Sequence, residues 1–506
     1  MSVETIPHDA MKLSVAPDQA WEPLPAGEWN DESIRHLLRR AGWTARPADV
    51  TRARQAGLAA TLDQLFPLQP PLLAKPPRLT KFEEGLPELQ RQQRETKDPE
   101  ERRMRQRELR ERSRQAVQDL SIKWLQFAAG PGAASFAKWS LFLGDVYVVS
   151  YEKVQNAALI YEHETILQRH GLGPAPALTK AVSRSPAMIQ YLDLNQSKKG
   201  APNENFAREL FELFTLGEGN YTEKDIKEAA RAFTGYRQRL GNVDLVPRQH
   251  DSGRKTIFGQ SGNYSGDDVI DLVYRQPAAG MFLPREMTRF YLTTEPLPPA
   301  YFEPLRAWWG GTGYDLRRLV HRFFGSRLFF DPSLRGNYIK SPLQFYLGLV
   351  QDLGLDVAPL PRQVLGSLRQ MGQVPFYPPN VRGWVGGRQW INSATLAARR
   401  QLVQALFTPV NEANLNADEM VEIAAARAAG QDRFTVTDER LREFSALDDE
   451  QVTARFVDYF LPASVTDDFR ETVRSFVATE GAPNRRDQRV RNTAVTLLQS
   501  PEYQLC

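Results

Sequence analysis

The chain has 506 residues, of which 42% are hydrophobic and 25% are charged, and this composition is typical of globular proteins with a substantial core. The net charge of +3 gives no argument for a nucleic-acid partner, and no apolar run reaches the roughly 18–20 residues that a membrane span needs. The single cysteine, Cys506, excludes an intramolecular disulfide and a cysteine-based metal site.

The N-terminal segment shows no targeting signal. From Met1 to Trp21 it mixes polar, acidic and proline residues and lacks the apolar centre of a secretion signal. We therefore expect a cytoplasmic protein, or a periplasmic one if a leader has been removed or a partner carries the chain. Residues 1–30 contain four prolines and are predicted to form an extended arm.

The rest of the chain is predicted to be mainly α-helical, with a large multi-helical globular fold and a small β-hairpin insertion at residues 236–266. Residues 31–410 are expected to form the main domain, and residues 411–506 a helical C-terminal lobe. Within the main domain, five prolines in residues 66–82 predict a surface excursion. Residues 98–129 predict one long helix, whose charged first half is stabilised by acid–arginine pairs at helical spacing.

The stretch from Asn203 to Gly217 is the most informative part of the sequence. At about 100° per residue, a helix here has one apolar and one polar face. The apolar face comprises Phe206, Ala207, Leu210, Leu213 and Phe214, and the polar face comprises Glu204, Asn205, Arg208, Glu209 and Glu212. Thr222 and Asp225 then form the capping-box pattern of a second helix, so residues 203–235 predict an αα-hairpin.

The polar face of this stretch is either solvated surface or the wall of a polar site. Its three carboxylates, with Asn203 or Asn205, offer the oxygen ligands that a hard cation prefers. Two of the carboxylates could instead divide the roles of general acid and general base. Arg208 lies four residues from both Glu204 and Glu212 and would neutralise both.

A second candidate is the polar loop that contains His250, Asp251 and Lys255, beside the expected hairpin. His250 could ligate a metal, or it could act as a base that Asp251 orients. The alternative is that the two residues form a pair that only stabilises a turn.

A third candidate is the loop from Pro378 to Ser393, which is rich in glycine and tryptophan. Tryptophan rings stack on sugars or cations, and arginine and asparagine give directional hydrogen bonds, so the loop could form a ligand platform. The residues that would contact a ligand are Arg382, Trp384, Trp390 and Asn392. The alternative is that the two tryptophans only anchor the loop to the core.

These motifs together resemble a bacterial family called domain of unknown function 1800. The resemblance covers roughly residues 32–505, with the motifs in the family's order. It is carried by His36 to Gly42, Pro186 to Met188, Tyr191 to Asp193, Asn203 to Gly217, Tyr221 to Asp225, Ala229 to Gly235, His250 and Asp251, Lys255 and Thr256, Gly259, Asn380 to Arg399, and Ser500 to Gln504.

The resemblance implies work in the cell envelope. Family members are often exported, and their genes often lie beside those of a sulfatase-like family, domain of unknown function 1501, which is the partner that the resemblance implies. Typical members also carry a Trp-His-x-His-Phe-like segment. The corresponding segment here, Leu143 to Tyr147, has no histidine, which implies altered chemistry if those histidines are ligands or catalysts.

Two hypotheses for function follow. In the first, the protein is a metal-assisted hydrolase or transferase that acts on a polar or saccharide-like envelope substrate. Its catalytic residues would be Glu204, Arg208, Glu209, Glu212, His250 and Asp251. Its substrate contacts would be Asn203, Asn205, Lys255, Arg382, Trp384, Trp390 and Asn392. A divalent metal would be held by Glu209, Glu212 and His250.

In the second hypothesis, the protein is a non-catalytic binding or assembly protein that works with the sulfatase-like partner. The motif residues then form a buried polar network that holds helices in register. The hypotheses differ in geometry, because the first requires residues 203–212, 250–256 and 380–392 to meet in one pocket.

Overall fold

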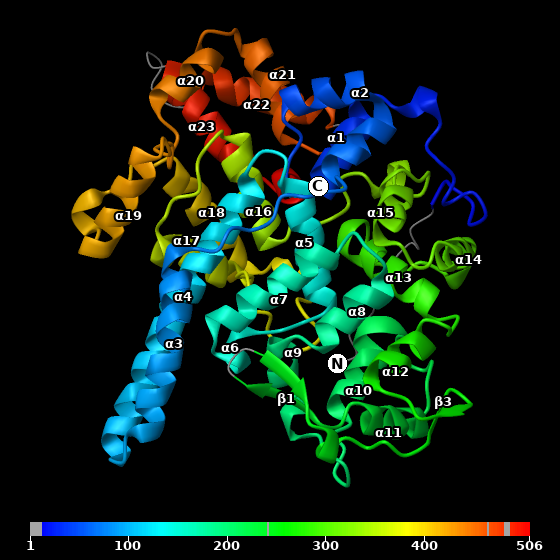
Figure 1. The fold of residues 1–506 in the computed structure, drawn as a ribbon. Helices are drawn as coiled ribbons and strands as arrows, with labels where there is room; N and C mark the ends of the chain where they lie inside the picture. Colours follow the sequence, from blue (N-terminus) through cyan, green and yellow to red (C-terminus); the bar gives the residue numbers. More distant parts are fainter. Residues whose placement is uncertain (1–12, 240–241, 463–464, 480–485) are drawn as a thin grey trace, which may run out of the picture.

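The structure is a computed structural model that describes residues 13–239, 242–462, 465–479 and 486–506. Helices dominate this part of the chain, and its only sheets are two small antiparallel pairs of strands (Figure 1). The prediction of a mainly α-helical fold is therefore confirmed. None of the described helices combines the length and the apolar character needed to cross a membrane.

The first part of the fold is purely helical. Its helices are α1 (Asp31–Ala41), α2 (Pro47–Leu65), α3 (Pro77–Glu95), α4 (Pro99–Ala129), α5 (Ala134–Val146), α6 (Tyr151–Val154), α7 (Ala157–His170), α8 (Ala175–Ser183) and α9 (Pro186–Tyr191). The described part of the N-terminal arm packs onto a later part of the chain, because Trp21 is buried and its ring lies beside those of Phe302 and Phe323.

Helices α3 and α4 form an antiparallel hairpin that extends away from the body (Figure 1). The predicted long helix at residues 98–129 is confirmed as α4, and the Asp98 side chain caps it by accepting a hydrogen bond from the Glu100 N–H at 3.1 Å. The sequence analysis did not anticipate α3, whose first turn lies in the predicted excursion. Proline at the first helical position is compatible with a helix, and here Pro77 begins α3 rather than continuing a loop.

The predicted αα-hairpin begins with a helix that changes its pitch. Helix α10 (Asn205–Glu209) continues directly into a π-helical turn, η3 (Leu210–Thr215), before α11 (Glu223–Ala232) begins. The predicted capping box is confirmed, because the Thr222 hydroxyl accepts from the Asp225 N–H and the Asp225 carboxyl accepts from the Thr222 N–H. The wider π turn alters which side chains share a face, so Phe211 is fully buried whereas Leu213 is only half-buried.

Two hairpins occupy the region where one was predicted. Strand β1 (Tyr236–Arg239) pairs with β2 (Asn242–Leu245), and β3 (Lys255–Ile257) pairs with β4 (Gln260–Gly262), both antiparallel. The second hairpin turns through Phe258 and Gly259, which have φ of 49° and 75°. Positive φ at both central residues characterises the tightest hairpin turns.

The remaining helices complete the body and the C-terminal region. They are α12 (Gly266–Val273), α13 (Ala279–Tyr291), α14 (Glu303–Gly311), α15 (Leu316–Phe324), α16 (Pro342–Asp352), α17 (Pro361–Met371), α18 (Ser393–Leu406), α19 (Ala417–Ala428), α20 (Asp438–Ser445), α21 (Asp449–Phe460), α22 (Asp467–Thr479) and α23 (Arg486–Leu498). One continuous cluster of buried apolar side chains extends from Val15 to Tyr503. Helix α5 crosses the middle of this core (Figure 1).

Candidate functional site

The helix formed by α10 and η3 (residues 205–215), called the acidic helix below, is stabilised by ion pairs that differ from those predicted. Arg208 makes a bidentate pair with Glu223 of α11, with both N–O distances at 2.8 Å, and lies 3.7 Å from Glu204. The predicted neutralisation of Glu212 by Arg208 is not the pairing observed. In the structure Glu212 pairs instead with Arg382, because the π turn intervenes between Arg208 and Glu212.

Glu212 connects the acidic helix to the glycine-rich loop. Its carboxylate accepts hydrogen bonds from the Tyr221 hydroxyl and from Arg382, both at 2.9 Å. Burial and the nearby Glu212 charge raise the pKa of Glu209, and the positive charge of Arg382 opposes this rise. The structure therefore brings two of the predicted segments together at an ion-pair cluster, in which Arg382 also contacts Glu218.

The loop with His250 is hydrogen-bonded to the C-terminal end of α11. The His250 ring lies 2.9 Å from the Thr234 carbonyl oxygen, and Asp251 accepts from Arg231 at 2.8 Å. The hydrogen bond from Arg231 is the main reason that the pKa of Asp251 falls to about 2. Lys255 is buried and donates to the carbonyls of Asp251 and Gly253, at 2.6 and 3.0 Å.

These contacts hold the two motifs at opposite ends of one helix. Arg208 pairs with Glu223, and Asp251 pairs with Arg231. Glu223 and Arg231 are eight residues apart on α11, which is roughly 12 Å at 1.5 Å per residue. Within the part of the chain that the structure describes, no group of three or more His, Cys, Asp or Glu side chains could hold a metal ion. The predicted ligands Glu209, Glu212 and His250 therefore do not form a common set.

The three predicted asparagines have local structural partners. Asn203 accepts from the Asn205 N–H at 3.0 Å and donates to the Asp193 carbonyl at 3.1 Å. The Asn205 side chain donates to the Leu192 carbonyl, and Asn392 forms the capping box of α18 with Thr395. These contacts shape the polypeptide turns that precede α10 and α18.

The two predicted tryptophans lie at a cavity of about 170 Å³ between α5, α13, α16 and the glycine-rich loop. Its lining combines aromatic rings with polar side chains, and both kinds of group occur in small-molecule sites. The aromatic side chains are Trp43, Phe290, Tyr338, Trp384 and Trp390. The polar side chains are Lys138, Asp145, Arg289, Thr294, Ser341, Gln344 and Gln373.

Asp145 is the carboxyl of this cavity, in the last turn of α5. It accepts a hydrogen bond from the backbone N–H of Trp384 at 2.8 Å. This bond holds the loop segment that contains Trp384 against α5. Burial raises the pKa of Asp145 to about 7, and the Trp384 hydrogen bond and Arg289 only partly offset this effect. A pKa near neutrality allows the carboxyl to hold or release a proton under ordinary conditions.

Lys138 lies two turns earlier on the same face of α5. Its ammonium donates to the Gly42 carbonyl at 2.9 Å and to the Gln344 side chain at 3.1 Å, and it lies over the Trp43 ring. Burial lowers the pKa of Lys138 to about 7. Below pH 7 the ammonium carries three donors, of which these partners use two, and above pH 7 the neutral amine has a lone pair that accepts from a ligand hydroxyl.

Trp384 also lines a second, smaller cavity of about 40 Å³ on its other side. His163 and Glu164 contribute to this cavity, and both have protein partners. The His163 ring contacts the Tyr147 carbonyl and the Ser185 hydroxyl, and Glu164 accepts from Ser140 at 2.7 Å. Burial lowers the pKa of His163 to about 4, so this ring is neutral at pH 7.

The sequence analysis proposed neither Asp145 nor Lys138 as a functional residue. Asp145 lies within Leu143 to Tyr147, the segment that corresponds to the family's histidine-containing motif. That correspondence is the one signal in the sequence that points to Asp145. Lys138 lies in a strongly apolar helix, where a lone lysine was the only cue.

The fold and the site together define a mainly helical protein with a small internal cavity that contains one carboxyl and one amine among aromatic rings. The chain belongs to the family described as protein of unknown function (DUF1800), whose model matches residues 36–505. A comparison with curated proteins and a comparison with solved structures each gave no match.

Proposed function

We propose that this protein binds a small polar ligand, of the size of a single sugar ring, in the cavity between Asp145 and Trp390. The observation that supports the proposal most strongly is the buried Asp145 carboxyl among tryptophan and tyrosine rings. Aromatic faces pack against the C–H surface of a sugar, while Asp145 and Lys138 offer hydrogen bonds to its hydroxyls. A cavity of about 150 Å³ holds one benzene ring, so a cavity of about 170 Å³ takes one six-membered ring, and the substituents of a sugar extend through its open edge.

The cavity also has a route to the surface. Val385 and Thr294 are exposed side chains that line it, and they form its outer edge. Arg382 holds the same loop to the acidic helix through Glu212. The acidic helix thus supports the loop that closes the cavity, which gives Glu212 a positioning role.

A hydrolase or transferase is the second candidate function. It is favoured by one observation, the pKa of Asp145 near 7, which suits a general acid or base. On this proposal Asp145 would donate a proton to the polar substrate in the cavity, or accept a proton from it. The family resemblance alone supports the further proposal of a sulfatase-like partner, domain of unknown function 1501, in the cell envelope.

A monosaccharide titration tests the binding proposal. Glucose, galactose and N-acetylglucosamine are titrated by calorimetry at pH 8, where the Asp145 carboxyl is charged. We expect saturable binding of at least one sugar, and loss of that binding in Val385→Trp, because a large ring at the outer edge blocks the cavity.

The matched control is Val421→Trp, an exposed valine on α19 that does not line this cavity. This variant should bind as the wild type does. Absence of saturable binding by all three sugars, or equal binding by Val385→Trp and wild type, would contradict the proposal.

A further inference from the structure

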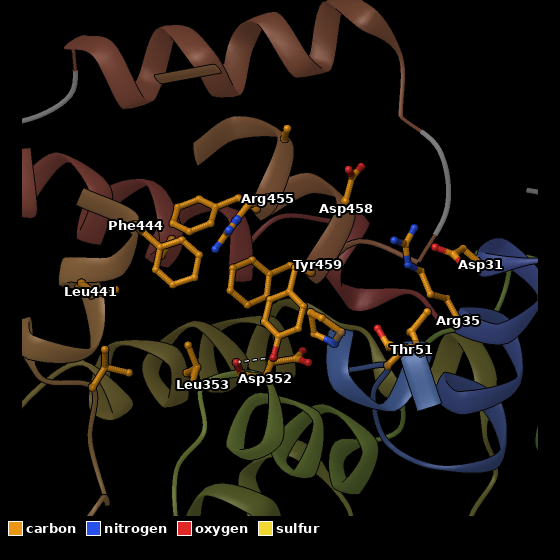
Figure 2. A pocket seen from close by; sticks show the side chains of 18 of the residues that line it. Asp31, Arg35, Thr51, Asp352, Leu353, Leu441, Phe444, Arg455, Asp458 and Tyr459 are labelled. Atoms are coloured by element: carbon orange, nitrogen blue, oxygen red, sulfur yellow. Dashed lines mark hydrogen bonds between the residues drawn. The ribbon is translucent and has the colours of Figure 1, made fainter. Parts of the chain in front are cut away.

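A second and larger cavity lies between the N-terminal helices and the C-terminal helices. It has a volume of about 590 Å³ and is lined by residues of α1, α2, α16, α20, α21 and α23 (Figure 2). This volume falls within the usual range for small-molecule sites. None of its lining residues belongs to the Asp145 cavity.

The interior of this cavity is apolar and aromatic. Leu441 and Phe456 are buried, and the Phe444 and Phe456 rings lie 5.1 Å apart between centroids. The Tyr459 ring lies at the centre of the view in Figure 2, where its hydroxyl donates to the Asp352 backbone carbonyl at 3.0 Å. The ring is therefore held in place as part of the cavity wall, 5.0 Å from the Phe460 ring between centroids.

The aspartates of the cavity already have partners. Asp31 forms an ion pair with Arg54, and Asp458 pairs with Arg470 at 3.2 Å. Asp352 accepts from the Tyr503 hydroxyl at 2.8 Å, and burial raises the pKa of Asp352. Each aspartate of the lining thus has a charged or hydrogen-bonding partner in the protein.

Two arginines of the lining are left without a carboxylate. Among the side chains that the structure describes, neither Arg35 of α1 nor Arg455 of α21 has an acidic group within ion-pair distance. Figure 2 places them on opposite sides of Tyr459. Arg35 is half-buried, so its charge is less screened than that of the exposed Arg455. The cavity therefore combines an apolar interior with two arginines that have no acidic partner among the described side chains.

We propose that this cavity binds a small organic carboxylate with an apolar body. The carboxylate pairs with the Arg35 guanidinium, whose fork of donors matches two carboxylate oxygens. The apolar body packs against Leu353, Phe444 and the Tyr459 ring. Arg455 adds to the positive field that attracts the anion to the cavity. This site is independent of the sugar-binding proposal.

The test is a calorimetric titration of the full chain with decanoate, and with decyltrimethylammonium as a probe of equal chain length and opposite charge. We expect one decanoate per chain, and binding of the cation at least about tenfold weaker. Arg35→Gln should weaken decanoate binding at least about tenfold, because the anion loses its charged partner. Ala454→Phe, which fills the cavity from α21, should remove binding.

Arg52→Gln is the matched control, since Arg52 lies on α2 outside this cavity. It should bind decanoate as the wild type does, and circular dichroism confirms that each variant is folded. Three results would overturn the proposal: no saturable decanoate binding, equal binding of the cationic probe, or wild-type affinity in folded Arg35→Gln and Ala454→Phe.

Discussion

Replacing Gly383 with alanine should lower the free energy of unfolding by about 2–5 kcal/mol. Gly383 has φ of +73°, a left-handed conformation that an alanine adopts only with strain. An added Cβ would also lie 2.1 Å from Asp145 Oδ1 and 2.9 Å from the Asp145 carbonyl oxygen. The loop must therefore move off α5, and the Trp384 N–H then loses its bond to Asp145. Urea denaturation measures the change in stability.

Gly132→Ala separates the two causes of this effect. Gly132 has φ of +75°, but no atom lies within 4 Å of an added Cβ there. The free energy of unfolding of this variant should fall by only about 1–2 kcal/mol, which is the cost of the left-handed backbone conformation without the steric clash. If the two variants lose the same free energy of unfolding, the close approach of Gly383 to Asp145 in the structure is incorrect.

Asp145→Asn should make the protein more stable than wild type at pH 8, by about 2–4 kcal/mol, and no more stable at pH 4. The folded-state pKa of Asp145 is about 7, whereas an unfolded aspartate titrates near 4. Below pH 4 both states hold the proton. Between pH 4 and 7 the unfolded state releases it while the folded state keeps it, so wild type loses stability as the pH rises. Asparagine retains an oxygen that accepts from Trp384 and has no proton to release.

Denaturation of both proteins across pH 4–8 checks this expectation. Asp18→Asn is the control, because Asp18 is exposed and the substitution removes the same charge. A stability difference between Asp145→Asn and wild type that does not change with pH would contradict the raised pKa. A carboxyl that weakens the fold at neutral pH is characteristic of a functional position rather than a structural one.

Local signals in the sequence predicted much of the helical framework. The capping box at Thr222 and the long helix at residues 98–129 were predicted close to their observed limits, because caps and helical charge spacing are local properties. The π turn at Leu210–Thr215 was not predicted, because every face was assigned with one regular helical period. Helix α3 was not predicted, because Pro76 and Pro77 fit a proline-rich excursion as well as a helix start.

The candidate site was only partly predictable, because it is built from side chains that are distant in sequence. Trp384 and Trp390 were identified from composition, and both line the cavity. Asp145 reaches them from a helix more than two hundred residues earlier, and a single sequence holds no trace of that contact. The motif at His250 was conspicuous in sequence, yet its polar groups contact their own loop and α11.

A paired sugar titration of Asp145→Asn and Glu209→Gln tests the central claim most directly. It uses the tightest of the three monosaccharides, at pH 8, with wild type as reference. The account predicts that Asp145→Asn weakens binding at least about tenfold, because a charged hydrogen-bond acceptor is lost, and that Glu209→Gln binds as wild type does. Loss of binding in Glu209→Gln together with wild-type affinity in Asp145→Asn would contradict the account and place the site on the acidic helix.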